Sequence, residues 1–101
     1  MHLVQILLPI YRPSGERQPE ALLNDVRDTL TSTFGGVTAY SRAPAEGVWK
    51  SGKGQEKDEI IIVEVMVESV DVDWWRTYRQ NLENLFAQEE IIVRTSEITM
   101  L

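Results

Sequence analysis

The stretch from Asp58 to Ser69, DEIIIVEVMVES, restricts the possible fold more than any other part of the chain. Its run of isoleucine and valine, without apolar residues at a helical spacing, predicts a β-strand. Both faces of this strand are apolar apart from one carboxylate, Glu64. Such a strand lies inside a sheet and needs cover on both faces, which a short chain can obtain from a second copy of itself. Alternation places Ile61, Val63, Val65 and Val67 on one face, and Ile60, Ile62, Glu64 and Met66 on the other.

The other elements follow from apolar periodicity and turn residues. Strands are predicted at 3–8, 37–42 and 90–98. Pro19 suits the first position of a helix that ends before Gly35 and Gly36, one of which we expect in the left-handed conformation. Asp71 or Asp73 caps a second helix. Its apolar stripe consists of Trp74, Tyr78, Leu82 and Leu85, with Trp75 and Phe86 adjacent. Because neighbouring helical residues point about 100° apart, one of Trp74 and Trp75 is expected at the rim or against a partner.

The resulting order is β-α-β-β-α-β within a single domain, residues 1–101. Short connections and right-handed crossovers predict a ferredoxin-like α+β sandwich, with a four-stranded antiparallel sheet and both helices on one face. The first and third strands are then central, and these are the two strands with apolar residues on both faces.

Helices on one face would leave a row of apolar side chains on the other face in water. Exposure of a row this large favours a partner surface, and a two-fold homodimer that packs sheet against sheet uses the same surface twice. The predicted interface residues are Leu3, Leu7, Ile60, Ile62 and Met66.

Composition excludes several classes of function. The chain of 101 residues contains no cysteine, which excludes disulfides and thiolate chemistry. Its net charge of −6 disfavours nucleic acid and anionic membranes as partners. The apolar run from Leu3 to Ile10 is interrupted by Gln5 and Pro9 and lacks a basic leader, so it predicts neither a signal peptide nor a membrane span. We therefore expect a cytoplasmic protein.

Neither a phosphate-binding loop nor a metal site is predicted. The segment from Gly47 to Lys53 matches the start of a phosphate-binding loop, but Gly54 stands where Ser or Thr would bind magnesium, and a strand follows instead of a helix. We interpret residues 43–57 as a hairpin connection. His2 is the only histidine and lies at the chain terminus, so no metal site is predicted. No cofactor motif is present either.

The best candidate site is the second face of the sheet. Gln5, Tyr40, Arg42 and Glu64 share this face, and Arg94 joins them if the last strand pairs in the matching register. A carboxylate between Ile62 and Met66 must be hydrated, neutralised or paired. Glu64 is therefore either part of an interfacial salt bridge that fixes the dimer register, which we favour, or a general base or ligand anchor.

Three residues outside this group are weaker ligand-binding candidates. Tyr11 and Arg12 follow the first strand, and Trp49 is placed to fold over the sheet as a lid. Tyrosine and tryptophan are more often packing residues than catalysts.

Several short motifs occur in a familiar order. Tyr11-Arg12-Pro13 ends the first strand, Phe34-Gly-Gly-Val-Thr38 follows the first helix, and Gly47-Val-Trp49 and Phe86-Ala-Gln-Glu89 come later. In this respect the chain resembles a family of small uncharacterised bacterial proteins within the ferredoxin-like, dimeric α/β-barrel group. The resemblance implies a dimer. Within the wider group similar domains serve as cofactor-independent oxygenases, isomerases, haem-related enzymes and ligand-binding modules, so the resemblance assigns no catalytic residue.

Three functions remain open at this point. The favoured one is a homodimeric structural or small-molecule-binding module. The second is a cofactor-independent oxygenase or isomerase acting on a hydrophobic substrate, with Glu64 as general base, Arg42 stabilising negative charge, and Tyr40 beside them. The third, RNA binding, is discounted, because RNA recognition motifs of this topology need stacking aromatics on the central strands and a basic surface.

Overall fold

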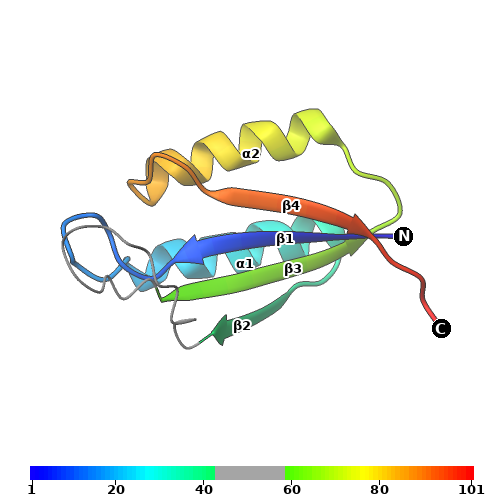
Figure 1. Ribbon diagram of the computed structural model, residues 1–101, viewed down its shortest axis with the longest axis horizontal. Helices are drawn as coiled ribbons and strands as arrows, with labels where there is room; N and C mark the ends of the chain where they lie inside the picture. Colours follow the sequence, from blue (N-terminus) through cyan, green and yellow to red (C-terminus); the bar gives the residue numbers. More distant parts are fainter. Residues whose placement is uncertain (43–58) are drawn as a thin grey trace, which may run out of the picture.

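The computed structural model describes residues 1–42 and 59–101. These residues form six elements in the predicted order, coloured along the chain in Figure 1. The predicted hairpin at 43–57, with Trp49 and the Gly47–Lys53 motif, lies outside them. The elements are β1 (His2–Pro9), α1 (Glu20–Phe34), β2 (Thr38–Arg42), β3 (Ile60–Val67), α2 (Val72–Leu85) and β4 (Ile92–Glu97).

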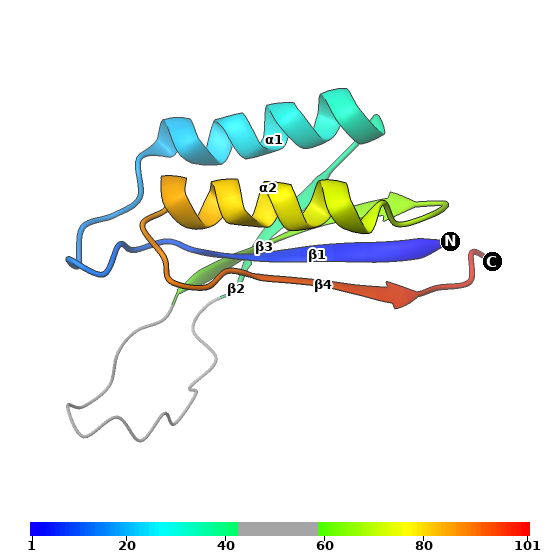
Figure 2. The ribbon, with the colours of Figure 1, turned by 90° about the horizontal axis from the view of Figure 1, so that it is seen from above.

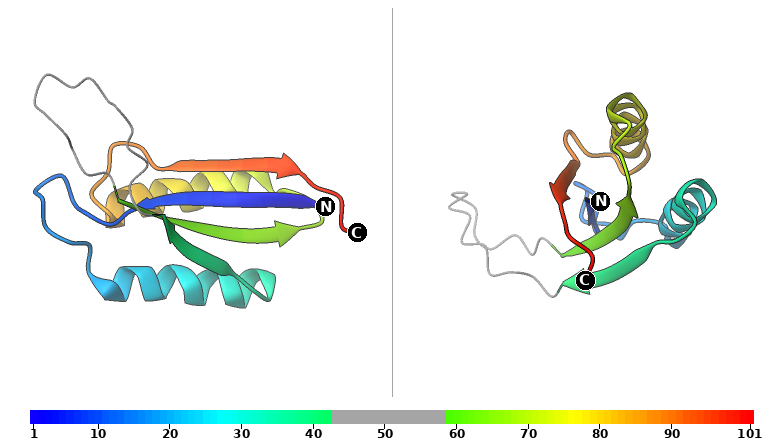
Figure 3. Two further views of the ribbon diagram at one scale, coloured as in Figure 1. Left: turned by 60° about the horizontal axis from the view of Figure 1, so that its bottom comes forward. Right: turned by 90° about the vertical axis from the view of Figure 1, so that its right-hand side faces the viewer.

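The sheet has the strand order β2-β3-β1-β4, and every pair of neighbouring strands is antiparallel. This order confirms the ferredoxin-like arrangement, with β1 and β3 in the centre. Both helices lie on the same face of the sheet, α1 beside α2 (Figure 2). The end-on view in Figure 3 shows that neither of the two described helices lies on the opposite face. That face of the sheet is called the open face below.

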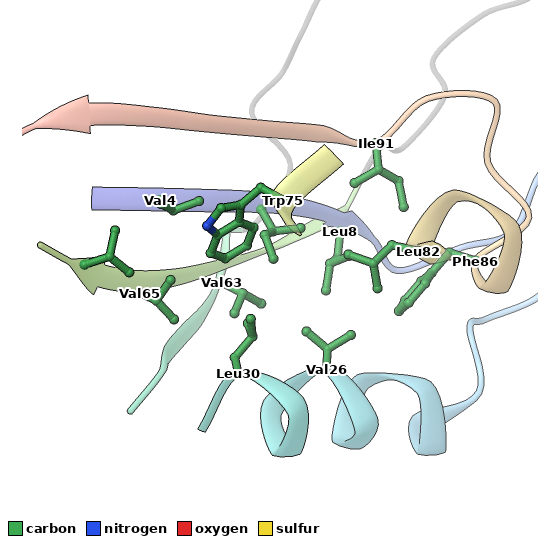
Figure 4. Close-up of a cluster of buried hydrophobic side chains, with 12 residues drawn as sticks. Val4, Leu8, Val26, Leu30, Val63, Val65, Trp75, Leu82, Phe86 and Ile91 are labelled. Carbon is green, nitrogen blue, oxygen red and sulfur yellow. The ribbon is translucent and has the colours of Figure 1, made fainter. Parts of the chain in front are cut away.

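The core fills the space between the sheet and the helices. Val4, Ile6 and Leu8 on β1 are each at most 1 % exposed, and they face the helices as predicted. Figure 4 shows Leu8 of β1 and Val63 of β3 on the side of the sheet that faces Val26 and Leu30 of α1. Alternation thus predicts the covered face correctly, although Ile61 is only partly buried at its margin.

The helix ends follow local chemistry. Gly35 ends α1 with φ +83°, a left-handed conformation that glycine adopts without strain, and its amide donates to the Thr31 carbonyl. The Asp71 carboxylate accepts a hydrogen bond from the Trp74 amide at 3.2 Å and so caps α2. Pro19 was expected at the first helical position but takes the N-cap position of α1, and Glu20 is the first helical residue.

An aromatic cluster joins the two helices. The Phe34 ring of α1 stacks on Trp75 at a centroid distance of 5.2 Å and meets the edge of Trp74 at 5.1 Å. Trp75 is 5 % exposed and Trp74 is half-buried at the rim. Because Phe34 contacts both rings, both tryptophans contribute to the same helix contact, while only Trp75 is fully buried.

The predicted stripe of α2 is wrong at its last position. Leu85 is 51 % exposed, whereas Leu82 and Phe86 are buried at 1 % and 0 %. The helix ends at Leu85, and the chain turns so that Phe86 enters the core (Figure 4). Phe86, which the sequence placed beside the apolar stripe, is thus the residue that anchors this end of the helix in the core.

The Tyr78 hydroxyl provides a pH-dependent contribution to stability. Burial chiefly raises its pKa from 10 to about 12, with a further increase from Asp25 and a partly opposing effect of its hydrogen bond with Thr29. Between these values the unfolded chain loses this proton before the folded chain does, so the free energy of unfolding falls as pH rises. Below pH 10 the group is protonated in both states and adds no slope.

We therefore expect Tyr78→Phe to remove part of the alkaline loss of stability. The measurement is urea unfolding of both proteins at intervals between neutral pH and pH 12. The difference in stability between wild type and variant should stay constant up to pH 10 and then change in favour of the variant. Parallel curves across the whole range would show that Tyr78 ionises alike in both states.

Candidate functional site: a polar row on the open face

Four polar side chains form a continuous hydrogen-bonded line across the open face, one from each strand. The Tyr40 hydroxyl donates to Glu64 Oε1 at 2.5 Å, and Gln5 Nε2 donates to the same oxygen at 2.6 Å. Arg94 Nε donates to Gln5 Oε1 at 2.9 Å. We call Tyr40, Glu64, Gln5 and Arg94 the polar row.

The strand register brings the row together. Gln5 on β1 pairs directly with Glu64 on β3 and with Arg94 on β4. Directly paired residues of antiparallel strands project to the same face, so the three side chains must lie side by side. Tyr40 pairs with Ile62, two residues from Glu64, and its long side chain spans the diagonal.

The Gln5 side chain links Glu64 to Arg94 through hydrogen bonds. The Gln5 amide donates through its nitrogen and accepts through its oxygen, and so it connects an acid to a base that lie two strands apart. Gln5 lies between Glu64 and Arg94, and within the described residues these two side chains form no ion pair. The carboxylate and the guanidinium are thus held in place, with their charges not directly neutralised by each other.

Apolar side chains surround the row. Met66 and Ile92 are 53 % and 50 % exposed, and Leu3, Leu7 and Ile60 are partly buried. Ile92 was not predicted here; it faces Leu7 in the pairing of β1 with β4, a register that the sequence does not reveal. These five residues are the apolar flanks of the row.

The expectation that Ile62 lies exposed on this face is wrong. Ile62 is on the open face, but it is 4 % exposed. It pairs with Leu7 on one side and Tyr40 on the other. With Leu7 and Tyr40 on its two sides, Ile62 has little accessible surface and contributes little to a docking surface.

A hollow lies at the β2 end of the row. Its volume is about 510 Å³, and its lining includes Leu3, Val37, Thr38, Glu64 and Met66. Thr38 begins β2 opposite Glu64, and the chain before it leaves the sheet towards α1. The hollow thus adjoins the carboxylate end of the row and not the arginine end.

The structure brings together only some of the residues predicted for the site. The Arg12 guanidinium donates to the Leu85 carbonyl at the end of α2, at 3.2 Å, which turns it towards the helices. Tyr11 pairs with Arg17 in an isolated antiparallel β-bridge of the backbone, in the turn after β1. It forms no hydrogen bond with the polar row. Arg42 ends β2, but its side chain lies outside the described part of the structure, as does all of Trp49.

Comparisons with protein-family models, curated proteins and solved structures found no match. Among the described helices, none is long and apolar enough to cross a membrane. Residues 1–42 and 59–101 contain no group of three or more potential metal ligands. His2, the one histidine, lies near the backbone oxygen of Glu68, 3.3 Å away, and near the Glu97 carboxylate at 3.7 Å.

Proposed function

We propose that the protein is a homodimeric module whose two sheets pack open face against open face. The observation that carries this proposal is the polar row within its apolar flanks. Apolar residues on an exposed sheet favour burial against a partner, and a row of polar groups among them fixes how that partner is oriented once the row is buried.

The partner we infer is a second copy of the chain, because the charges of the row are self-complementary. Consider a two-fold axis that lies between the two sheets and runs along β1. It reverses the strand order of the partner while Gln5 stays opposite Gln5 of the partner subunit. Glu64 then faces Arg94 of the partner subunit, and Arg94 faces Glu64 of the partner subunit.

Other orientations of the axis are less favourable. An axis along the row, perpendicular to the strands, places Glu64 opposite Glu64 of the partner subunit and Arg94 opposite Arg94 of the partner subunit. Like charges facing each other across an interface cost several kcal/mol. Sheets pack about 10 Å apart, a separation that glutamate and arginine side chains can bridge together. The row therefore selects the axis along β1.

The same contacts favour an interface over catalysis. Glu64 Oε1 already accepts from two donors, and Gln5 uses both ends of its amide within the row. The resemblance to the dimeric α/β-barrel group agrees with a dimer. We therefore keep the module as the proposed function and assign no reaction to Glu64.

Light scattering over a dilution series tests the proposal. Wild type is expected at twice the chain mass of 11.6 kDa, and Met66→Lys, on the apolar flank, at the mass of one chain. Leu85→Lys is the matched control, because Leu85 is equally exposed, 51 % against 53 %, but lies on the helix side. It should remain a dimer. A monomeric wild type, or equal behaviour of the two variants, would refute the proposal.

A further inference from the structure

A second cavity lies on the other side of the sheet, between α2 and β4. Its volume is about 190 Å³. Its walls are mostly apolar, formed by Val4, Val70, Val72, Trp75 and Val93. Figure 4 shows Trp75 beside Val4, at the end of the core nearest this cavity. None of these residues belongs to the polar row or its apolar flanks.

Two arginines of α2 also line the cavity. Arg76 and Arg79 are three residues apart, and Arg79 is four residues from Trp75, so all three share one side of the helix. Arg94 lines the cavity as well, but its guanidinium is bonded to Gln5 on the open face. Arg76 and Arg79 are thus the cations available to the cavity.

Arg79 has a buried donor without an acceptor. Its Nε atom is inaccessible to solvent and has no hydrogen-bond partner. A buried polar group left unpaired costs about 1–3 kcal/mol, so an orphan of this kind in a native structure calls for an explanation. Within the described residues the one ion pair is His2 with Glu97, so no carboxylate of this part of the chain neutralises Arg76 or Arg79.

We propose that this cavity binds a small carboxylic acid with an aromatic or short aliphatic body. A carboxylate accepts two parallel hydrogen bonds from a planar guanidinium, and two arginines, Arg76 and Arg79, line this cavity. The valines and Trp75 contact the apolar body of the ligand. A cavity of about 150 Å³ holds benzene, so about 190 Å³ suits a ring with one carboxylate.

The charge of the protein makes this cavity selective. The chain has a net charge of −6, which repels anions from most of its surface. Two unneutralised arginines beside an apolar cavity are a local exception. An anion without an apolar part would bind the arginines but leave the valine and tryptophan walls without contacts, and a neutral aromatic molecule would leave Arg76 and Arg79 without an anion.

The test uses three probes and NMR titration of the isotope-labelled protein. Benzoate is expected to bind saturably and to shift the amide signals of Val70, Val72 and Val93. Benzyl alcohol, which keeps the ring without the charge, and inorganic phosphate, which keeps the charge without the ring, should each bind at least tenfold more weakly. Equal binding of either one would overturn the assignment of an apolar carboxylate.

Two variants locate the binding. Arg79→Gln should weaken benzoate binding at least tenfold, and Arg79→Lys, which keeps the charge but not the planar fork, should give a smaller loss. Arg27→Gln on the exposed side of α1 should leave binding unchanged. Unchanged affinity in Arg79→Gln would refute the site. The amide shifts in the wild-type protein locate the bound benzoate without any variant. The site can therefore be tested even if Arg79→Gln does not fold.

The outcome is separable from that of the proposed dimer, because the cavity lies on the helix side of the sheet. A monomeric protein that binds benzoate would refute only the dimer, and a dimer without benzoate binding would refute only this cavity as a ligand site.

Discussion

Phe86→Ala is expected to lower the free energy of unfolding by about 3–5 kcal/mol, the usual cost of removing a fully buried phenylalanine. Phe86 is 0 % exposed and belongs to the core between the sheet and α2. The Phe86 backbone carbonyl accepts a hydrogen bond of 2.7 Å from the side-chain amide of Gln18, which is also buried. This contact places Phe86 where the turn before α1 meets the end of α2. Removal of the phenylalanine ring leaves a cavity at that place.

Urea unfolding followed by circular dichroism measures this effect. Leu85→Ala is the control, since it removes an apolar side chain from the adjacent position, which is 51 % exposed. Its effect should stay within about 0.5 kcal/mol. Phe86→Leu, which retains most of the volume, is available if the alanine variant does not fold. Similar losses for Leu85→Ala and Phe86→Ala would contradict the described end of α2.

Glu64→Arg is expected to weaken self-association by at least about 100-fold. In the proposed dimer each new arginine faces Arg94 of the partner subunit, so the substitution creates two like-charge contacts by symmetry. Each contact of this kind costs up to several kcal/mol when it is desolvated. The measurement is the dissociation constant of the dimer by sedimentation.

Glu64→Gln separates charge reversal from the loss of a side-chain contact. It retains one acceptor oxygen for Tyr40 and Gln5 but removes the charge, and we expect it to weaken the dimer less than Glu64→Arg. Thermal unfolding of both variants shows whether the monomer is intact. If Glu64→Arg associated as tightly as wild type, Glu64 would not lie in the interface.

The fold is largely predictable because its sequence patterns are regular. The alternation in 58–69 and the apolar residues of β1 place these two strands in the centre of the sheet. Gly35 and Asp71 mark helix ends through chemistry that does not depend on the rest of the fold. These local signals agree with one another, and together they select the β-α-β-β-α-β order.

The candidate site is only partly predictable. Gln5, Tyr40 and Glu64 are placed on one face by alternation alone. Arg94 and Ile92 join them only through the pairing of β4 with β1, which is a long-range register. An edge strand with few buried residues carries little information about its own register.

The structure also differs from the sequence-based expectation where the neighbours of a side chain determine how exposed it is. Leu85 and Phe86 are adjacent and both apolar, and the turn at the end of α2 determines which one is buried. Ile62 is shielded by its neighbours, and Arg12 turns towards the Leu85 carbonyl at the helix end. The unpaired Arg79 Nε has no signature in the sequence either, because it depends on how α2 packs over β4.

The most direct test of the sheet-to-sheet dimer is to mix two charge-reversed variants and measure molar mass by light scattering. Glu64→Arg and Arg94→Glu should each be monomeric alone, because like charges then face each other in both symmetric contacts. In the mixture every such contact pairs an arginine with a glutamate, so we predict a heterodimer of twice 11.6 kDa. Variants that stay monomeric when mixed, although each is folded, would contradict the proposed axis along β1.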